Sequence, residues 1–192
     1  AAMVLGFLDA LHIPTATLIG HSMGGIIAAY TAVLAPERTH KLILIEPGFY
    51  HGNAPAFLKY LFFPLQRIMA KSFYTPEGRL KTLSGSFYNK KLIPEELLAA
   101  YLQAGSTPNA IAALEHMMRT ADTESYTGVS LKITTPTLLA WSRNNPNNPL
   151  ADGHRLEREI KGSRLVIIEE SGHYIQEEQP QALAAVIHAF ID

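Results

Sequence analysis

The sequence predicts an α/β protein with a parallel sheet of about four strands and a helical insertion. Two observations lead to this class. Short runs of consecutive apolar residues alternate with longer segments of helical spacing, and a Gly-His-Ser-Met-Gly-Gly turn at residues 20–25 joins the first run to a segment without helix breakers. Runs that are apolar throughout are typical of parallel strands covered on both faces. Strands that alternate with helices favour right-handed crossovers within one sheet.

The expected elements follow one another along the chain. Apolar residues at helical spacing predict a helix over residues 1–12, and a strand at 16–20 precedes the glycine-rich turn. The helix expected at 23–35 is apolar nearly all round, which predicts deep burial. Further strands are expected at 41–45, 136–141 and 164–168.

Residues 49–128 interrupt this alternation. Their apolar residues recur at helical spacing, as at 57–62, 97–102 and 111–118, and prolines divide them into short helices. Eleven of the 16 phenylalanines and tyrosines fall between Phe49 and Tyr101. We therefore predict a core formed by 1–48 and 129–192, and a helical cap, 49–128, over the carboxyl edge of the sheet. Most of these aromatic rings should pack the cap itself, and a few should line an apolar cleft.

Composition narrows the class of function. The chain has 192 residues, a formal net charge of −1 and 17% charged residues, so nothing favours nucleic acid. Its apolar runs stop well short of the ~20 residues of a membrane-spanning helix. The absence of cysteine excludes disulfides and thiolate chemistry and suits a cytoplasmic protein. No histidine pair has a metal-ligand spacing, so we expect neither a metal nor a cofactor.

The turn at residues 20–25 has the Gly-x-Ser-x-Gly pattern of a nucleophile elbow. A strand before it and a helix after it favour that interpretation over an ordinary turn, and they predict Ser22 as a nucleophile. We expect Gly20 and Gly24 to relieve crowding around the strained serine, and Gly25 to let the helix start close to the sheet.

A serine nucleophile requires a base, and the sequence offers eight histidines. His173 is the best candidate, because it follows the last expected strand and therefore lies at the same sheet edge as Ser22. His21 neighbours the serine in sequence, but its side chain leaves the turn in another direction. We expect His21 to pack or to form hydrogen bonds.

Three motifs together resemble the α/β-hydrolases, in the branch of capped serine esterases, lipases and C–C-bond hydrolases. They are the turn at 20–25, the strand and loop at 136–141, and Gly172-His173 followed by the Glu-Glu-Gln-Pro of 177–180. The resemblance covers essentially the whole chain and corresponds to the C-terminal half of that fold. It implies that His173 is the base and that the backbone N–H of Met23 is one oxyanion donor.

The chain departs from that family pattern in two ways. It begins at the helix before the nucleophile strand, so about four strands and the loop with the second oxyanion donor are missing. We expect either a missing amino-terminal segment or a homodimer that completes the fold. Moreover, Asn145 stands where the family places its triad acid. Glu46, at the end of the neighbouring strand, is the alternative acid, as in haloalkane dehalogenases and certain lipases; otherwise it is a surface or cap-anchoring residue.

These features predict a serine hydrolase that forms an acyl-enzyme. Ser22 would attack the carbonyl of a small, largely apolar ester or a related compound, with His173 as base. The competing interpretation is a ligand-binding protein on the same fold that does not turn its ligand over. Asn145 favours the second interpretation, whereas Ser22 and His173 favour the first.

Overall fold

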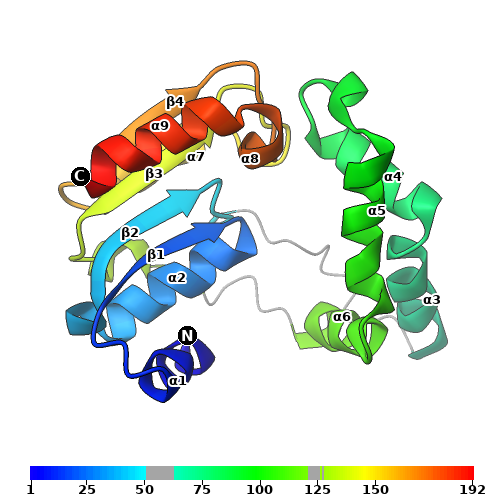
Figure 1. Cartoon of the computed structure of the whole chain (residues 1–192), viewed down its shortest axis with the longest axis horizontal. Helices are drawn as coiled ribbons and strands as arrows, with labels where there is room; N and C mark the ends of the chain where they lie inside the picture. The colour runs from blue at the N-terminus through cyan, green and yellow to red at the C-terminus, as the bar shows by residue number, and fades with distance from the viewer. Residues whose placement is uncertain (51–62, 121–125, 127) are drawn as a thin grey trace.

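A computed structural model describes residues 1–50, 63–120, 126 and 128–192. Its sheet contains four parallel strands in the order of the sequence (Figure 1). These strands are β1 (Ala16–His21), β2 (Thr39–Ile45), β3 (Thr137–Ser142) and β4 (Arg164–Ile168). The predicted α/β class with a parallel sheet is therefore confirmed.

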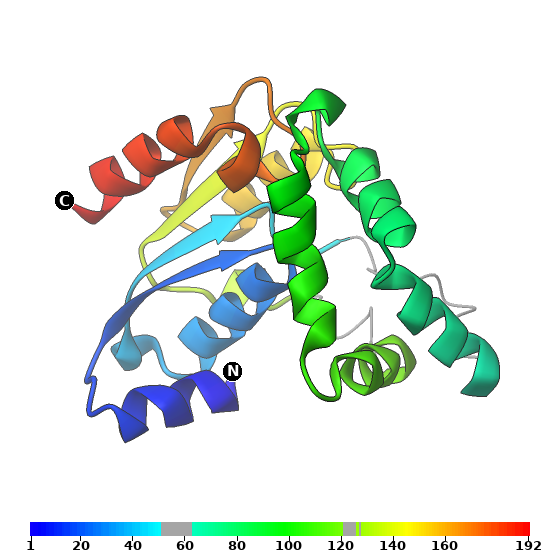
Figure 2. The ribbon, with the colours of Figure 1, turned by 45° about the vertical axis from the view of Figure 1, so that its right-hand side comes forward.

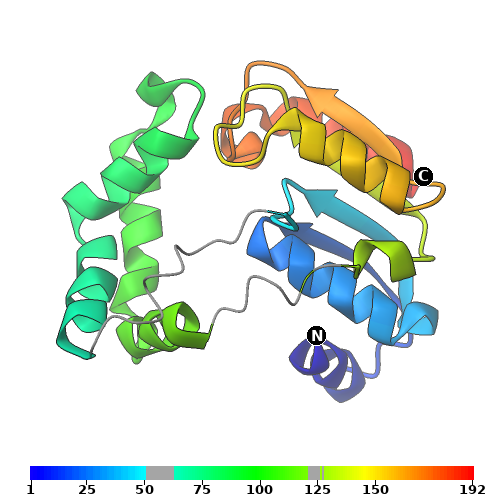
Figure 3. The same cartoon turned by 180° about the vertical axis from the view of Figure 1, so that it is seen from behind.

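Helices cover both faces of this sheet. They are α2 (Met23–Leu34), α7 (Leu150–Glu159), α8 (Ile175–Glu178) and α9 (Pro180–Ile191), whereas α1 (Ala2–Ala10) packs on α2. Leu42 and Leu44 of β2 point into a cluster with α2 and α7, and Ile43 and Ile45 point into one with α8 and α9. Figure 3 shows α2 and α7 side by side on one face. Burial on both faces is why β2 reads as a continuous apolar run.

The deep burial predicted for the helix at 23–35 holds for only one face of α2. It buries the stripe that faces the sheet, including Ile26 and Ala29, but Ile27 is 40% and Leu34 63% exposed. Helix α1 contacts α2 on one side only. Strand β1 is the edge of the described sheet, and its Ile19 is half exposed.

Four helices occupy the described part of the insertion between β2 and β3. They are α3 (Phe63–Phe73), α4 (Pro76–Ser86), α5 (Glu95–Gln103) and α6 (Ala110–Thr120). They stand beside the edge at which the strands of the sheet end (Figures 1 and 2). Short 3-10 helices lie at Pro36–Arg38, Lys90–Leu92, Ala104–Ser106 and Ser130–Lys132. The helical spacing at 57–62 lies outside the described residues, and the division into a core and a cap stays a prediction.

The insertion is tied to the rest of the chain near both of its ends and in its middle. The hydroxyl groups of Tyr50 and Ser130 both donate to the Glu159 carboxylate on α7, the first over 2.7 Å. In the middle, the backbone N–H of Asn89 donates to Glu178 Oε1 over 2.9 Å. The first two bonds join the ends of the insertion to α7, and the third holds the turn after α4 against α8.

No helix within the described ranges is both long and apolar enough to cross a bilayer. The same residues contain no group of three or more His, Asp or Glu side chains that could hold a metal ion.

Candidate active site

Ser22 lies in a sharp turn between β1 and α2. Its backbone has φ 52° and ψ −119°, a region that a residue with a side chain rarely adopts. Its N–H donates to the carbonyl of Ile45 over 2.9 Å, which ties the turn to β2. The strand, strained serine and helix therefore follow one another as the elbow pattern predicts.

The glycines of this turn have different roles. A Cβ at Gly20 would lie 2.3 Å from the carbonyl oxygen of Gly24, so position 20 must be glycine for the helix to fold back onto the strand. A Cβ at Gly25 would lie 3.0 Å from Pro47 Cβ, which agrees with a close approach of α2. A Cβ at Gly24 would meet nothing within 4 Å. The expectation that Gly24 relieves crowding was therefore wrong.

This difference predicts opposite effects of two alanine substitutions. Gly20→Ala should lower the free energy of unfolding by about 1–3 kcal/mol, because the new methyl group meets backbone that cannot turn away. Gly24→Ala should leave stability unchanged or raise it by up to about 1 kcal/mol, because alanine favours a helix. Urea unfolding of both variants checks this pair. Equal losses at the two positions would contradict the described turn.

The structure brings His173 to Ser22. Its Nε2 lies 3.0 Å from Ser22 Oγ, although the residues are 151 positions apart. The backbone N–H of His173 donates to the carbonyl of Ser86 over 2.8 Å, so the insertion helps to hold the loop. A Cβ at Gly172 would lie 2.3 Å from that same carbonyl oxygen, which explains the glycine.

His21 also supports the His173 loop. Its Nε2 lies 2.7 Å from the carbonyl oxygen of His173, and because a carbonyl only accepts, Nε2 carries the proton. The two rings lie 4.8 Å apart between centroids. Burial lowers the pKa of both histidines. The pKa of His173 falls to about 4, mainly through burial and further through the charge of His21. His173 is therefore neutral at pH 7, as a base must be.

Asn145 occupies the position beside His173 that a triad acid would take. Its Nδ2 lies 2.9 Å from His173 Nδ1 and donates to Glu46 Oε2 over 2.6 Å. Its Oδ1 accepts the N–H of Asn147 over 2.8 Å. A carboxylate acceptor at one end and a backbone donor at the other fix which end of the amide is nitrogen.

This orientation determines where His173 carries its proton. An amide nitrogen cannot accept, so His173 Nδ1 must accept from Asn145, and the proton of the neutral ring is on Nε2. His173 Nε2–H then donates to Ser22 Oγ instead of accepting its proton. The carboxylate of a conventional triad produces the opposite tautomer.

Glu46 is fully buried at the end of β2, so the alternative that it is a surface residue was wrong. Its Oε1 accepts from the N–H and the hydroxyl of Ser142, each over 2.6 Å. Burial raises the pKa of Glu46 to about 7, and these donors together with Asn145 and Asn148 limit the rise. Among the described contacts, Glu46 reaches His173 only through Asn145.

The backbone N–H of Met23 has no acceptor among the described residues. It lies in the first turn of α2, where such groups favour negative charge. Sequence reasoning missed Ser142, which holds Glu46, and Glu178, whose Oε2 accepts the N–H of Gly172 over 2.6 Å. No local pattern signals the contact of Ser142 with Glu46, because these residues are 96 positions apart and meet only in the folded chain.

The family follows from the geometry and from comparison with known proteins. Residues 1–186 match the model of the alpha/beta hydrolase family, and the chain belongs to that family. The sheet, the elbow at Ser22 and the histidine after the last strand agree with this assignment.

Several named hydrolases are similar to the chain. An uncharacterized hydrolase, YugF, of Bacillus subtilis is 28% identical over 192 residues, covering 100% of this chain and 70% of the relative. A 2-hydroxy-6-oxo-6-phenylhexa-2,4-dienoate hydrolase of Burkholderia cepacia is 30% identical, and the match covers 95% of this chain and 64% of the relative. The solved structure of an enzyme with that name from Rhodococcus has a TM-score of 0.78 at 22% identity, covering 98% and 68%. The chain thus spans about two thirds of these relatives.

Proposed function

We propose that the protein is a serine hydrolase of small carbonyl compounds. The observation that carries this proposal is the 3.0 Å contact between Ser22 Oγ and His173 Nε2 at a strained turn between strand and helix. The Met23 N–H beside the serine, which has no acceptor among the described residues, supports it, as do relatives that are named hydrolases. No cofactor is required for this chemistry.

In the proposed reaction, Ser22 Oγ attacks the substrate carbonyl carbon while its proton passes to His173 Nε2. The Met23 N–H stabilises the oxyanion of the tetrahedral intermediate. His173 then gives the proton to the leaving group, and an acyl-enzyme remains. Water attacks the acyl carbon, its proton passes through His173 to Ser22 Oγ, and the acid product leaves.

Asn145 slows this reaction in our account. His173 must first move its ring proton from Nε2 to Nδ1, where the amide nitrogen of Asn145 cannot accept it. In the serine-protease example, replacing the triad aspartate by asparagine costs ~10⁴ in kcat, or about 5.5 kcal/mol. We therefore propose a low turnover and a substrate that is reactive or tightly bound.

Aromatic side chains beside His173 support a largely apolar substrate. Tyr174 lies 5.5 Å from His173, 5.3 Å from Phe87 and 5.7 Å from Tyr101, measured between ring centroids. Phe87 and Tyr101 come from the insertion, which supports its proposed role as a cap. The ester class is the simplest acyl donor that this machinery accepts.

One observation favours the competing function, a protein that binds its ligand without turnover. The hydrogen bond from Asn145 to His173 Nδ1 leaves Ser22 as an acceptor, which suits a site that holds a carbonyl compound without attacking it. We still predict that the second oxyanion donor comes from a missing amino-terminal segment or from the other protomer of a homodimer.

A fluorophosphonate probe separates the two functions. If Ser22 is a nucleophile, its Oγ displaces fluoride from the probe, and the protein gains one covalent label that mass spectrometry locates on residue 22. Ser22→Ala should abolish labelling without changing the melting temperature. A folded wild-type protein that is never labelled would establish the binding function instead.

A further inference from the structure

Glu178 on α8 is a buried carboxylate that the proposed reaction does not use. Its side chain is 6% exposed, and among the described residues it forms no ion pair. Its Oε2 accepts the N–H of Gly172 over 2.6 Å, and its Oε1 accepts the N–H of Asn89 over 2.9 Å. Hydrogen bonds to a carboxylate are roughly twice as strong as those between neutral groups. Glu178 therefore joins the residue before His173 to the turn after α4.

Ser86, the last residue of α4, contacts both loops that carry the site. Its carbonyl accepts the N–H of His173 over 2.8 Å, and its Oγ accepts from Asn147 Nδ2 over 3.0 Å. The backbone N–H of Asn147 in turn donates to Asn145 Oδ1 over 2.8 Å, and Asn145 Nδ2 lies 2.9 Å from His173 Nδ1. Ser86 thus links the loop of the base to the loop of the amide that sets its tautomer.

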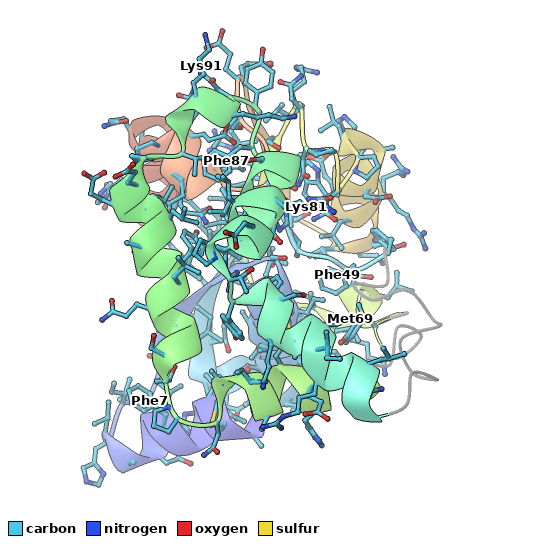
Figure 4. All side chains as sticks on the ribbon, turned by 90° about the vertical axis from the view of Figure 1, so that its right-hand side faces the viewer. Phe7, Phe49, Met69, Lys81, Phe87 and Lys91 are labelled. Atoms are coloured by element: carbon cyan, nitrogen blue, oxygen red, sulfur yellow. The ribbon has the colours of Figure 1, made fainter. Side chains whose placement is uncertain are left out.

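The turn after α4 packs directly on the backbone of the His173 loop. A Cβ at Gly172 would lie 2.3 Å from the carbonyl oxygen of Ser86 and 2.7 Å from the backbone nitrogen of Tyr88. Phe87, which Figure 4 labels at the end of α4, is 4% exposed, and its ring lies 5.3 Å from that of Tyr174. This contact leaves the loop no room on the side of the insertion.

The rest of the protein holds this loop less fully. Among the described contacts, the backbone of Gly172 and His173 has one partner on the side of the sheet, His21 Nε2, which lies 2.7 Å from the carbonyl oxygen of His173. If the insertion moved away, the N–H of His173 would lose its acceptor and Glu178 would lose one of its two donors. A buried polar group without a partner is costly, so the loop would rearrange.

We propose that Glu178 and Ser86 are positioning residues for His173, and that its ring faces Ser22 only while the turn after α4 is docked on the loop. This inference rests on the proposed hydrolase function, in which His173 exchanges a proton with Ser22. Docking of the insertion becomes a condition for turnover. A substrate that contacts the insertion then favours the arrangement that attacks it, because it binds that arrangement more tightly.

Steady-state kinetics test the proposal. Glu178→Gln keeps the shape of the side chain, but an amide has a single acceptor oxygen, so one of the two backbone N–H groups loses its partner. We expect kcat for 4-nitrophenyl butyrate to fall by about 10- to 100-fold with KM within about three-fold, because a small displacement of the base affects attack more than binding. Ser86→Ala removes only the bond to Asn147 and should lower kcat by about five-fold.

Two matched controls keep this result specific. Glu170→Gln removes an exposed carboxylate from the same loop, and Ser84→Ala removes a half-buried hydroxyl from the same helix. Neither side chain takes part in the contacts above, so both variants should keep kcat within about two-fold of wild type. If Glu178 were merely structural, Glu178→Gln would lower the melting temperature and leave kcat per folded molecule unchanged. That result would overturn the proposal.

An NMR titration of His173 needs no turnover and separates this proposal from failure of the hydrolase function. Burial holds the pKa of His173 at about 4 in the wild type. A displaced ring gains water, so we expect this pKa to rise by about one unit or more in Glu178→Gln. Loss of the negative charge of Glu178 alone would lower it, so a rise reports movement of the ring.

The other titratable groups around the ring stay in place in this variant. They are His21 and Tyr174 beside it, and Glu46 beyond Asn145. If the pKa of His173 does not rise in Glu178→Gln, the positioning role is wrong even where Ser22 turns over esters. If it rises in a protein that hydrolyses no ester, the positioning role is supported and only the hydrolase function fails.

Discussion

Asn145→Asp is expected to raise kcat by about 10²- to 10⁴-fold, reversing the direction of the usual aspartate-to-asparagine loss. The new carboxylate can accept a proton from His173 Nδ1, which leaves Nε2 free to take the proton of Ser22. Hydrolysis of 4-nitrophenyl esters by the two proteins, with Ser22→Ala backgrounds subtracted, measures the effect. A variant that folds but is no faster would show that the tautomer of His173 does not limit the reaction.

Glu46 complicates this variant in a way that can be tested. Its Oε2 lies 2.6 Å from Asn145 Nδ2, so two carboxylates would meet there and could not both ionise. Adding Glu46→Gln should remove the conflict, because the glutamine amide can donate to the new carboxylate while its oxygen accepts from Ser142. We expect the double variant to keep its high kcat to higher pH than Asn145→Asp alone. A single variant that is equally active at high pH would contradict the close approach of the two groups.

The second large effect concerns pH and stability. Glu46 has a pKa of about 7 in the folded protein against 4.5 for the unperturbed group, because it is buried. Between these values the unfolded chain has lost the proton and the folded chain has kept it, so stability falls as pH rises. The shift corresponds to about 3 kcal/mol, which is present below pH 4.5 and lost as pH rises through 7.

The measurement is the difference between wild type and Glu46→Gln in the free energy of unfolding, taken from pH 4 to pH 8. His173 acts in the opposite direction, because its pKa falls to about 4 and its contribution to stability is lost as pH falls through that value. The contribution of His173 is present in both proteins, so it cancels in the difference between their free energies of unfolding. The wild type should lose stability relative to the variant by about 3 kcal/mol across this range. A constant difference would mean that Glu46 titrates normally.

Ser22 and His173 could be predicted from the sequence because parallel strands deliver their following turns to one edge of a sheet. The elbow pattern depends on neighbouring residues, and the histidine follows the last strand. The sheet itself was predictable for a similar reason, since β2 is buried on both faces and reads as one apolar run.

The tautomer of His173 could not be predicted in this way. It depends on the amide orientation of Asn145, which Glu46 fixes from β2 and the backbone of Asn147 fixes from the same loop. The burial of Arg79 on α4 could not be predicted either, because a charged residue in a helix is normally exposed and its burial depends on how α4 packs. Leu34 on α2 is the opposite case, an apolar residue that is exposed. The apolar pattern of a helix does not say which of its faces another element covers.

Asn145 donates to Nδ1 of His173 and so keeps the ring proton on Nε2. Nitrogen NMR of ¹⁵N-histidine-labelled protein tests it directly at neutral pH, with His173→Gln to assign the ring signals. We predict a protonated Nε2 and a bare Nδ1 in the wild type, and the reverse in Asn145→Asp. A wild-type His173 with its proton on Nδ1 would show that Asn145 does not determine the tautomer.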